Sequence, residues 1–129
     1  MQGLHLIADL YDCQAPTELM FDAARLEAYC VNACRRHELT VVGQLFHAFC
    51  DEHGQSAGVT GTVVLAESHL AIHTWPEIGA VTLDIYVCNY SCDNSLRAEA
   101  LFTEVTEKFS PKRIERNAVQ RGQLESARA

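Results

Sequence analysis

Alternation of apolar and polar residues along the chain predicts a series of β-strands. From Leu4 to Tyr11 every second residue is apolar, which is typical of a strand with one face in a core. Further strands are predicted at residues 39–49, 59–66, 68–75 and 80–88, with a shorter one at 114–119. A polar loop at residues 50–58 separates the second strand from the third.

Two longer segments carry apolar residues at helical spacing. The first predicted helix runs from Thr17, a suitable N-cap, to about His37, and its stripe is Leu19, Met20, Ala23, Leu26, Cys30 and Ala33. The second runs from Ser95 to Phe109 and stops before Ser110-Pro111, with the stripe Leu96, Ala100, Leu101, Val105 and Phe109. The tail to Ala129 is expected to be frayed.

The order β-α-β-β-β-β-α-β predicts an α+β fold: a two-layer sandwich in which two helices cover one face of a largely antiparallel sheet. The opposite face of strand 80–88 would carry Thr82, Asp84, Tyr86 and Cys88. This mixture is unlike a plain solvated surface, so we expect a second copy to pack there and form a homodimer. The 129 residues are expected to form a single domain, 1–129.

Composition narrows the possible functions. A net charge of −7 argues against nucleic acid as a partner, because phosphate binding needs a basic face. Asp9 interrupts the first apolar run, and no run is long enough to span a bilayer, so neither a signal peptide nor a membrane segment is expected. Six cysteines without a Cys-x-x-Cys pair are expected to be free thiols in a cytoplasmic protein, with Cys30 and Cys34 acting as small buried residues.

Reactive side chains gather between residues 65 and 77. Ser68 follows an apolar run at a predicted strand boundary, where the backbone can adopt a strained turn. A serine-hydrolase elbow is not indicated, because glycine does not flank Ser68. Alone, Ser68 and His73 could simply satisfy local hydrogen bonds.

A metal site is also not expected in this stretch. His69 and His73 are four residues apart, which on a strand separates them by about 13 Å, too far to share one ion. The helical metalloprotease pattern is missing as well, because Leu70 follows His69 where that pattern needs glutamate.

The longer pattern is more specific. Glu67-Ser68-His69, then His73-Thr74-Trp75-Pro76-Glu77 and finally Cys88, resembles the prokaryotic S-adenosylmethionine decarboxylase proenzymes. The resemblance extends from the opening Gly3-Leu4-His5-Leu6 strand to the second helix. It implies self-cleavage between Glu67 and Ser68 into a β chain (1–67) and an α chain (68–129). Ser68 would become a covalent pyruvoyl cofactor that binds the substrate amine as a Schiff base.

The same resemblance implies the catalytic roles. His73 would remove the α-proton of Ser68 during cleavage, a task for which imidazole is suited because it titrates near neutral pH. Cys88 would donate a proton after CO₂ leaves, since a thiol is mostly protonated near neutrality. Thr60 stands where relatives carry serine and is expected to assist processing.

The resemblance also implies substrate contacts. Phe49 and Trp75 would stack on the adenine of S-adenosylmethionine, Glu77 would bind the ribose hydroxyls, and Leu70 is expected among the contacts. The product would be the aminopropyl donor for spermidine synthesis.

The chain departs from its relatives mainly in the substrate region. Ala48 replaces a basic residue, Ile78-Gly79-Ala80 replaces Tyr-Gly-Tyr, and the loop Cys50–Ala57 is longer. An alternative is therefore a pyruvoyl-dependent decarboxylase of ornithine or arginine. A non-enzymatic partner subunit is not favoured, because Ser68, His73 and Cys88 are all present.

Overall fold

The computed structural model describes residues 2–14, 17–90 and 92–123. The elements, in chain order, are β1 (Gly3–Tyr11), α1 (Thr17–Phe21), α2 (Ala23–Arg36), β2 (Val41–Cys50), β3 (Ser56–Leu65), β4 (Ser68–Trp75), η1 (Pro76–Ile78), β5 (Ala80–Cys88), α3 (Ser95–Phe109) and β6 (Arg113–Arg121). The bounds of β4, β5 and α3 are those that the sequence predicts.

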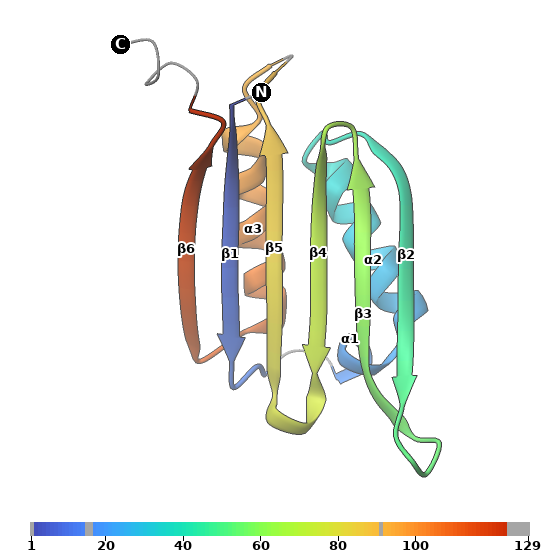
Figure 1. Cartoon of the computed structure of the whole chain (residues 1–129). Helices are drawn as coiled ribbons and strands as arrows, with labels where there is room; N and C mark the ends of the chain where they lie inside the picture. The colour runs from blue at the N-terminus through green and yellow to red at the C-terminus, as the bar shows by residue number, and fades with distance from the viewer. Residues whose placement is uncertain (1, 15–16, 91, 124–129) are drawn as a thin grey trace.

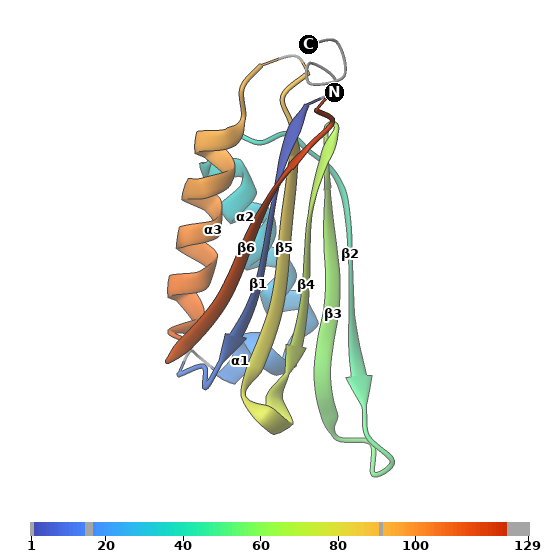
Figure 2. The same ribbon diagram turned by 60° about the vertical axis from the view of Figure 1, so that its left-hand side comes forward.

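The strands form one sheet in the order β2-β3-β4-β5-β1-β6, and every neighbouring pair is antiparallel. All the helices lie against one face of this sheet, as Figures 1 and 2 show. The α+β two-layer fold predicted from the sequence is therefore confirmed. We call the face without helices the open face.

The core lies between the sheet and the helices and follows the predicted alternation. Leu6 and Leu10 of β1, and Val81 and Ile85 of β5, are fully buried there. Cys30 and Cys34 also lie in this core as free thiols, as expected. Burial raises the pKa of Cys34 to about 12 and raises the pKa of Cys30 as well, so both thiols stay protonated.

The first helical segment differs from the prediction, because it is two helices rather than one. Asp22 interrupts it with an extended backbone, and its carboxylate accepts a hydrogen bond (3.1 Å) from the backbone N–H of Arg25. Asp22 therefore caps α2, while Thr17 only begins the short α1. The physical reason is that an aspartate side chain competes with the helical backbone for its N–H groups.

The predicted stripe of α3 is also partly wrong. Leu96 is 84% exposed and Ala100 is exposed, whereas Ala98 and Phe102 are buried. Leu96 and Ala100 each lie two residues from Ala98, which turns them about 200° away from it around a helix. The core therefore selects the stripe Ala98, Leu101, Phe102, Val105, Phe109.

The turn between β2 and β3 and the last strand, β6, differ slightly from expectation. β3 begins at Ser56, because the Asp51 carboxylate accepts hydrogen bonds from the backbone N–H groups of His53 and Gln55 and closes a tighter turn than predicted. β6 is exposed and lies beside β1 at the edge of the sheet. The predicted frayed tail falls largely on residues 124–129, outside the described residues. Among the described residues, no helix is both long and apolar enough to cross a membrane.

Candidate active site

The turn between β3 and β4 holds the predicted cleavage point. Leu65 pairs with Ser68, so only Ala66 and Glu67 form the turn. Glu67 has a φ of 64°, in the left-handed region that side chains other than glycine rarely adopt. Such a conformation costs about 1–2 kcal/mol. The strained turn predicted before Ser68 is therefore present, and the strain lies directly before the Glu67–Ser68 peptide bond.

Ser68 and Cys88 meet at this end of the sheet. Ser68 begins β4, Cys88 ends β5, and the Ser68 hydroxyl oxygen accepts a hydrogen bond (3.2 Å) from the backbone N–H of Cys88. Cys88 is only 6% exposed. The structure thus brings together two of the three predicted catalytic residues and holds the Ser68 oxygen through the backbone.

His73 lies elsewhere, beside Thr60. The two residues pair across β3 and β4, and Thr60 Oγ1 is 2.5 Å from His73 Nδ1. His73 is five residues beyond Ser68 on the same strand, which places it about 16 Å away. The chain by itself therefore does not bring His73 to Ser68, although it does pair His73 with the other predicted processing residue.

The predicted substrate residues line a hollow at the far end of β4. It measures about 430 Å³ and is lined by Phe49, Ala57, Val59, Thr60, His73, Thr74, Trp75 and Glu77. Phe49 and Trp75 are each nearly half exposed, so their rings are available to a ligand. The structure thus joins the predicted stacking pair, the predicted ribose carboxylate and the Thr60–His73 pair in one site.

Leu70 does not join this hollow. Its side chain is fully buried in the core, on the helix side of the sheet. Any contact that it makes with a ligand on the open face therefore comes from its backbone.

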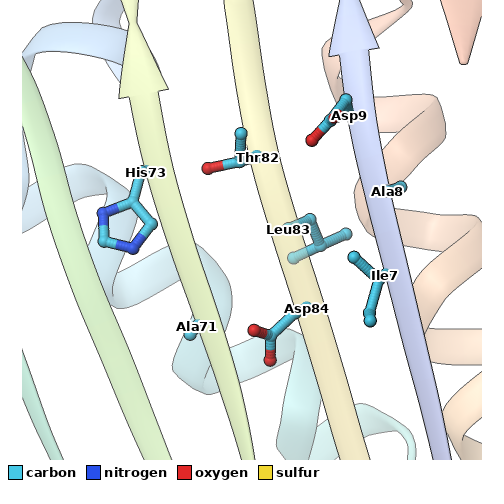
Figure 3. Close-up of a pocket in the computed structure, with 8 residues that line it drawn as sticks. All are labelled: Ile7, Ala8, Asp9, Ala71, His73, Thr82, Leu83 and Asp84. Carbon is cyan, nitrogen blue, oxygen red and sulfur yellow. The ribbon is translucent and has the colours of Figure 1, made fainter. Parts of the chain in front are cut away.

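A second, smaller hollow of about 90 Å³ lies on the open face, beside the middle of β4 and β5. Figure 3 shows His73 and Asp84 on the strands that border it, with Thr82 and Asp9 nearby. The polar character predicted for this face of β5 is therefore confirmed.

Sequence reasoning missed one group of side chains on the open face. His5 and His69 both contact the carboxylate of Asp84, each at 3.2 Å. The sequence offered only a weak signal for this group of side chains. β1 and β5 are far apart in the chain, and the apolar pattern of neither strand shows that the two pair with each other.

Comparisons with known proteins identify the family of this chain. The S-adenosylmethionine decarboxylase family matches residues 4–122. The S-adenosylmethionine decarboxylase proenzyme of Archaeoglobus fulgidus is 37% identical over 93% of this chain and 97% of the relative. The proenzyme of the same name from Aquifex aeolicus is 36% identical over 95% of this chain and 83% of the relative.

A solved structure gives the same result for the fold. The crystal structure of the adenosylmethionine decarboxylase from Aquifex aeolicus superposes with a TM-score of 0.80 at 30% sequence identity, covering 95% of this chain and 92% of that one. The match in sequence and in fold spans both ends of the site described above. The chain therefore belongs to the S-adenosylmethionine decarboxylase family and is a decarboxylase, an enzyme of the lyase class.

Proposed function

We propose that this protein is a proenzyme that cleaves itself between Glu67 and Ser68 and then decarboxylates S-adenosylmethionine. The observation that carries the proposal is the turn itself, in which a strained Glu67 precedes a serine whose hydroxyl oxygen is fixed by a backbone N–H. Membership of the family supports it, as do the proenzyme names of the relatives. The spermidine precursor is the expected product.

Cleavage would begin with attack of the Ser68 hydroxyl on the carbonyl carbon of Glu67. The amide becomes an ester as the proton of the hydroxyl passes to the nitrogen, and the strained φ of Glu67 is relieved when the bond breaks. Loss of the Ser68 α-proton then expels the ester oxygen with Glu67, which leaves 1–67 with a carboxylate end. Hydrolysis of the remaining unsaturated residue releases ammonia and leaves a pyruvoyl group on 68–129.

The residues around Ser68 fit such a group. The Cys88 N–H that now donates to the Ser68 oxygen would remain in place to donate to an oxygen there. The pyruvoyl group supplies a ketone that holds the substrate amine and takes up electrons from the breaking carboxylate bond. Cys88, whose backbone contacts Ser68 at the end of β5, would return a proton to the substrate carbon.

We infer further that the working enzyme is a homodimer in which two chains share each site. Ser68 and Cys88 lie at one end of β4 and β5, while His73, Thr60 and the aromatic hollow lie on the open face toward the other end of β4. A second copy packed on this face in the opposite direction would bring the hollow of one chain to Ser68 of its partner. Exposed apolar side chains on the face, including Ile7, Leu45 and Val64, favour such packing.

The hollow supports S-adenosylmethionine rather than a smaller substrate. Its volume of about 430 Å³ lies within the range of small-molecule sites. Two aromatic rings suit a flat base, and the Glu77 carboxylate can accept hydrogen bonds from two ribose hydroxyls. Ornithine and arginine carry neither a flat heterocyclic base for the two rings nor ribose hydroxyls for Glu77, so we do not favour them.

Intact-mass measurement of the natively purified protein tests the proposal directly. We expect the fragments 1–67 and 68–129, the second without a free N-terminal amine and trapped covalently by S-adenosylmethionine and borohydride. The Ser68→Ala variant, as control, should remain a single chain. A wild-type protein that stays continuous across residues 67 and 68 and does not react with carbonyl reagents would refute the proposal.

A further inference from the structure

Three side chains from three adjacent strands converge on the open face, away from the aromatic hollow. His5 lies on β1, Asp84 on β5 and His69 on β4. The Nε2 atoms of both histidines lie 3.2 Å from the same oxygen, Oδ1 of Asp84. In the single chain, all three side chains are partly exposed, at 17%, 37% and 40% for His5, Asp84 and His69 respectively. Figure 3 shows the Asp84 carboxylate on this face.

We propose that His5, His69 and Asp84 form a binding site for a divalent transition-metal ion of the zinc type. Two imidazole nitrogens and one carboxylate oxygen are a ligand set that such ions prefer. The three ligand atoms lie within 4.8 Å of one another. Ligands about 2.0–2.1 Å from a tetrahedral ion are about 3.4 Å apart, so the two contacts at 3.2 Å already have nearly the required spacing.

Packing holds the two rings in suitable orientations. The ring planes of His5 and His69 are 86° apart with centroids at 6.0 Å, so their nitrogens approach Asp84 from different directions. The Tyr86 ring contacts both, at 5.7 Å from His5 and 5.8 Å from His69. A site whose ligands are already held by neighbours needs little rearrangement to bind an ion. Three protein ligands would leave the fourth tetrahedral position for water.

Arg121 of β6 opposes this use of His5. Its NH1 lies 3.3 Å from His5 Nδ1, and a guanidinium can only donate. The His5 proton must then be on Nε2, where it donates to Asp84. A metal-bound imidazole needs the reverse, a free electron pair on Nε2 and an N–H on Nδ1 directed at an acceptor. Arg121 therefore lowers the affinity of the site, and removing it should raise that affinity.

The proposal does not depend on self-cleavage. No residue of the site is among Ser68, His73, Cys88 or the lining of the aromatic hollow. The uncut Ser68→Ala protein should therefore bind the ion as the wild type does. Failure of the metal site and failure of the proposed function can thus be told apart.

Cobalt provides the test, because tetrahedral Co²⁺ absorbs visible light where Zn²⁺ does not. Metal-free protein with residues 1–67 and 68–129 both present is titrated with Co²⁺, and Zn²⁺ is then added as competitor. We expect one ion per chain with visible bands of a tetrahedral site. The near-ultraviolet band of a cobalt–thiolate bond should be missing, which excludes the six cysteines as ligands.

Four variants locate the ion. His69→Ala and Asp84→Asn each alter a proposed ligand and should weaken Co²⁺ binding strongly. The loss should exceed the factor of about 10 to 100 that is typical when a group hydrogen-bonded to a ligand is replaced. Arg121→Gln should strengthen binding, because the glutamine carbonyl can accept the Nδ1–H of His5, and misfolding cannot produce such a gain. The control His53→Ala removes an exposed loop histidine and should change nothing.

Two results would overturn the proposal. One is wild-type protein that binds no Co²⁺ beyond the level left in Asp84→Asn, with both proteins folded by circular dichroism. The other is binding that neither His69→Ala nor Arg121→Gln alters. Either result would mean that the three side chains form a hydrogen-bonded network only.

Discussion

At the scale of single residues, the backbone does much of the positioning at Ser68. The hydroxyl oxygen is held by the backbone N–H of Cys88, a contact that does not involve the thiol. Glu67 supplies the strain before the bond, and no glycine is needed to create it. We therefore expect that the proposed cleavage and turnover can be separated by changing one side chain.

The Cys88→Ala variant should cleave normally but turn over poorly. Alanine keeps the backbone N–H that holds Ser68, while it removes the proposed proton donor, a loss that typically costs about 10²- to 10⁴-fold in rate. Gel analysis measures cleavage, and CO₂ release from labelled S-adenosylmethionine measures turnover. The control Cys92→Ala removes an exposed thiol and should affect neither. An uncut Cys88→Ala chain would contradict this division of roles.

At the scale of elements, one carboxylate ties α3 to the end of α2. Glu104 of α3 accepts a hydrogen bond from the Tyr29 hydroxyl (3.0 Å), contacts His37 Nε2 (2.9 Å) and forms an ion pair with Arg36. The Arg36 guanidinium, assisted by His37 and Tyr29, lowers the pKa of Glu104 from 4.5 to about 2. The two helices are thereby linked over the outer surface of the core.

Glu104→Gln should lower the free energy of unfolding by about 1–3 kcal/mol at neutral pH, because it weakens charge-assisted hydrogen bonds. Since the folded pKa is lower than the unfolded one, the stabilisation is complete above about pH 4.5 and is lost as the pH falls toward 2. Urea titrations of both proteins between pH 7 and 2.5 provide the measurement. The difference between them should shrink with acid, and a difference independent of pH would argue against this role.

At the scale of the whole molecule, the distance along β4 is the important fact. About 16 Å of strand separates Ser68 from His73, and Trp75 is farther still. A single chain therefore holds the two groups of proposed site residues at opposite ends of β4. Two chains facing each other would complete two sites, each built from both partners.

Complementation tests this sharing. Trp75→Ala disrupts the hollow and Cys88→Ala removes the proton donor, so each variant alone should be nearly inactive. Co-expressed chains that pair at random should recover about a quarter of wild-type activity, because half of the dimers are mixed and each mixed dimer has one intact site. Activity of the mixture no higher than that of the separate variants would place the whole site within one chain.

Much of the fold could be predicted because its signals are local. Alternation along β1 and β5 identifies the buried face, since successive side chains of a strand point to opposite sides. The helix break at Asp22 and the exposure of Leu96 were not predicted, for a different reason. An apolar residue every third or fourth position fits both a continuous helix and a broken one, and only packing against the sheet decides which stripe is buried.

The candidate site was predicted unevenly. The family resemblance predicted residues at both ends of β4, and the structure brings Phe49, Trp75 and Glu77 together in one hollow. The separation of His73 from Ser68 could have been read from strand spacing, by the same reasoning that keeps His69 and His73 apart. The contact of His5 with Asp84 could not be read in this way, because it depends on which strands become neighbours.

The sequence by itself determined where the strands lie, which of their faces is buried, and which reactive groups stand at the Glu67–Ser68 bond. These properties follow from periodicity and from covalent neighbours, which any chain carries before it folds. Only the tertiary structure decided that β5 lies between β4 and β1, which places His5 and His69 on one carboxylate. Sheet order is set by packing between distant segments, and no local pattern specifies it.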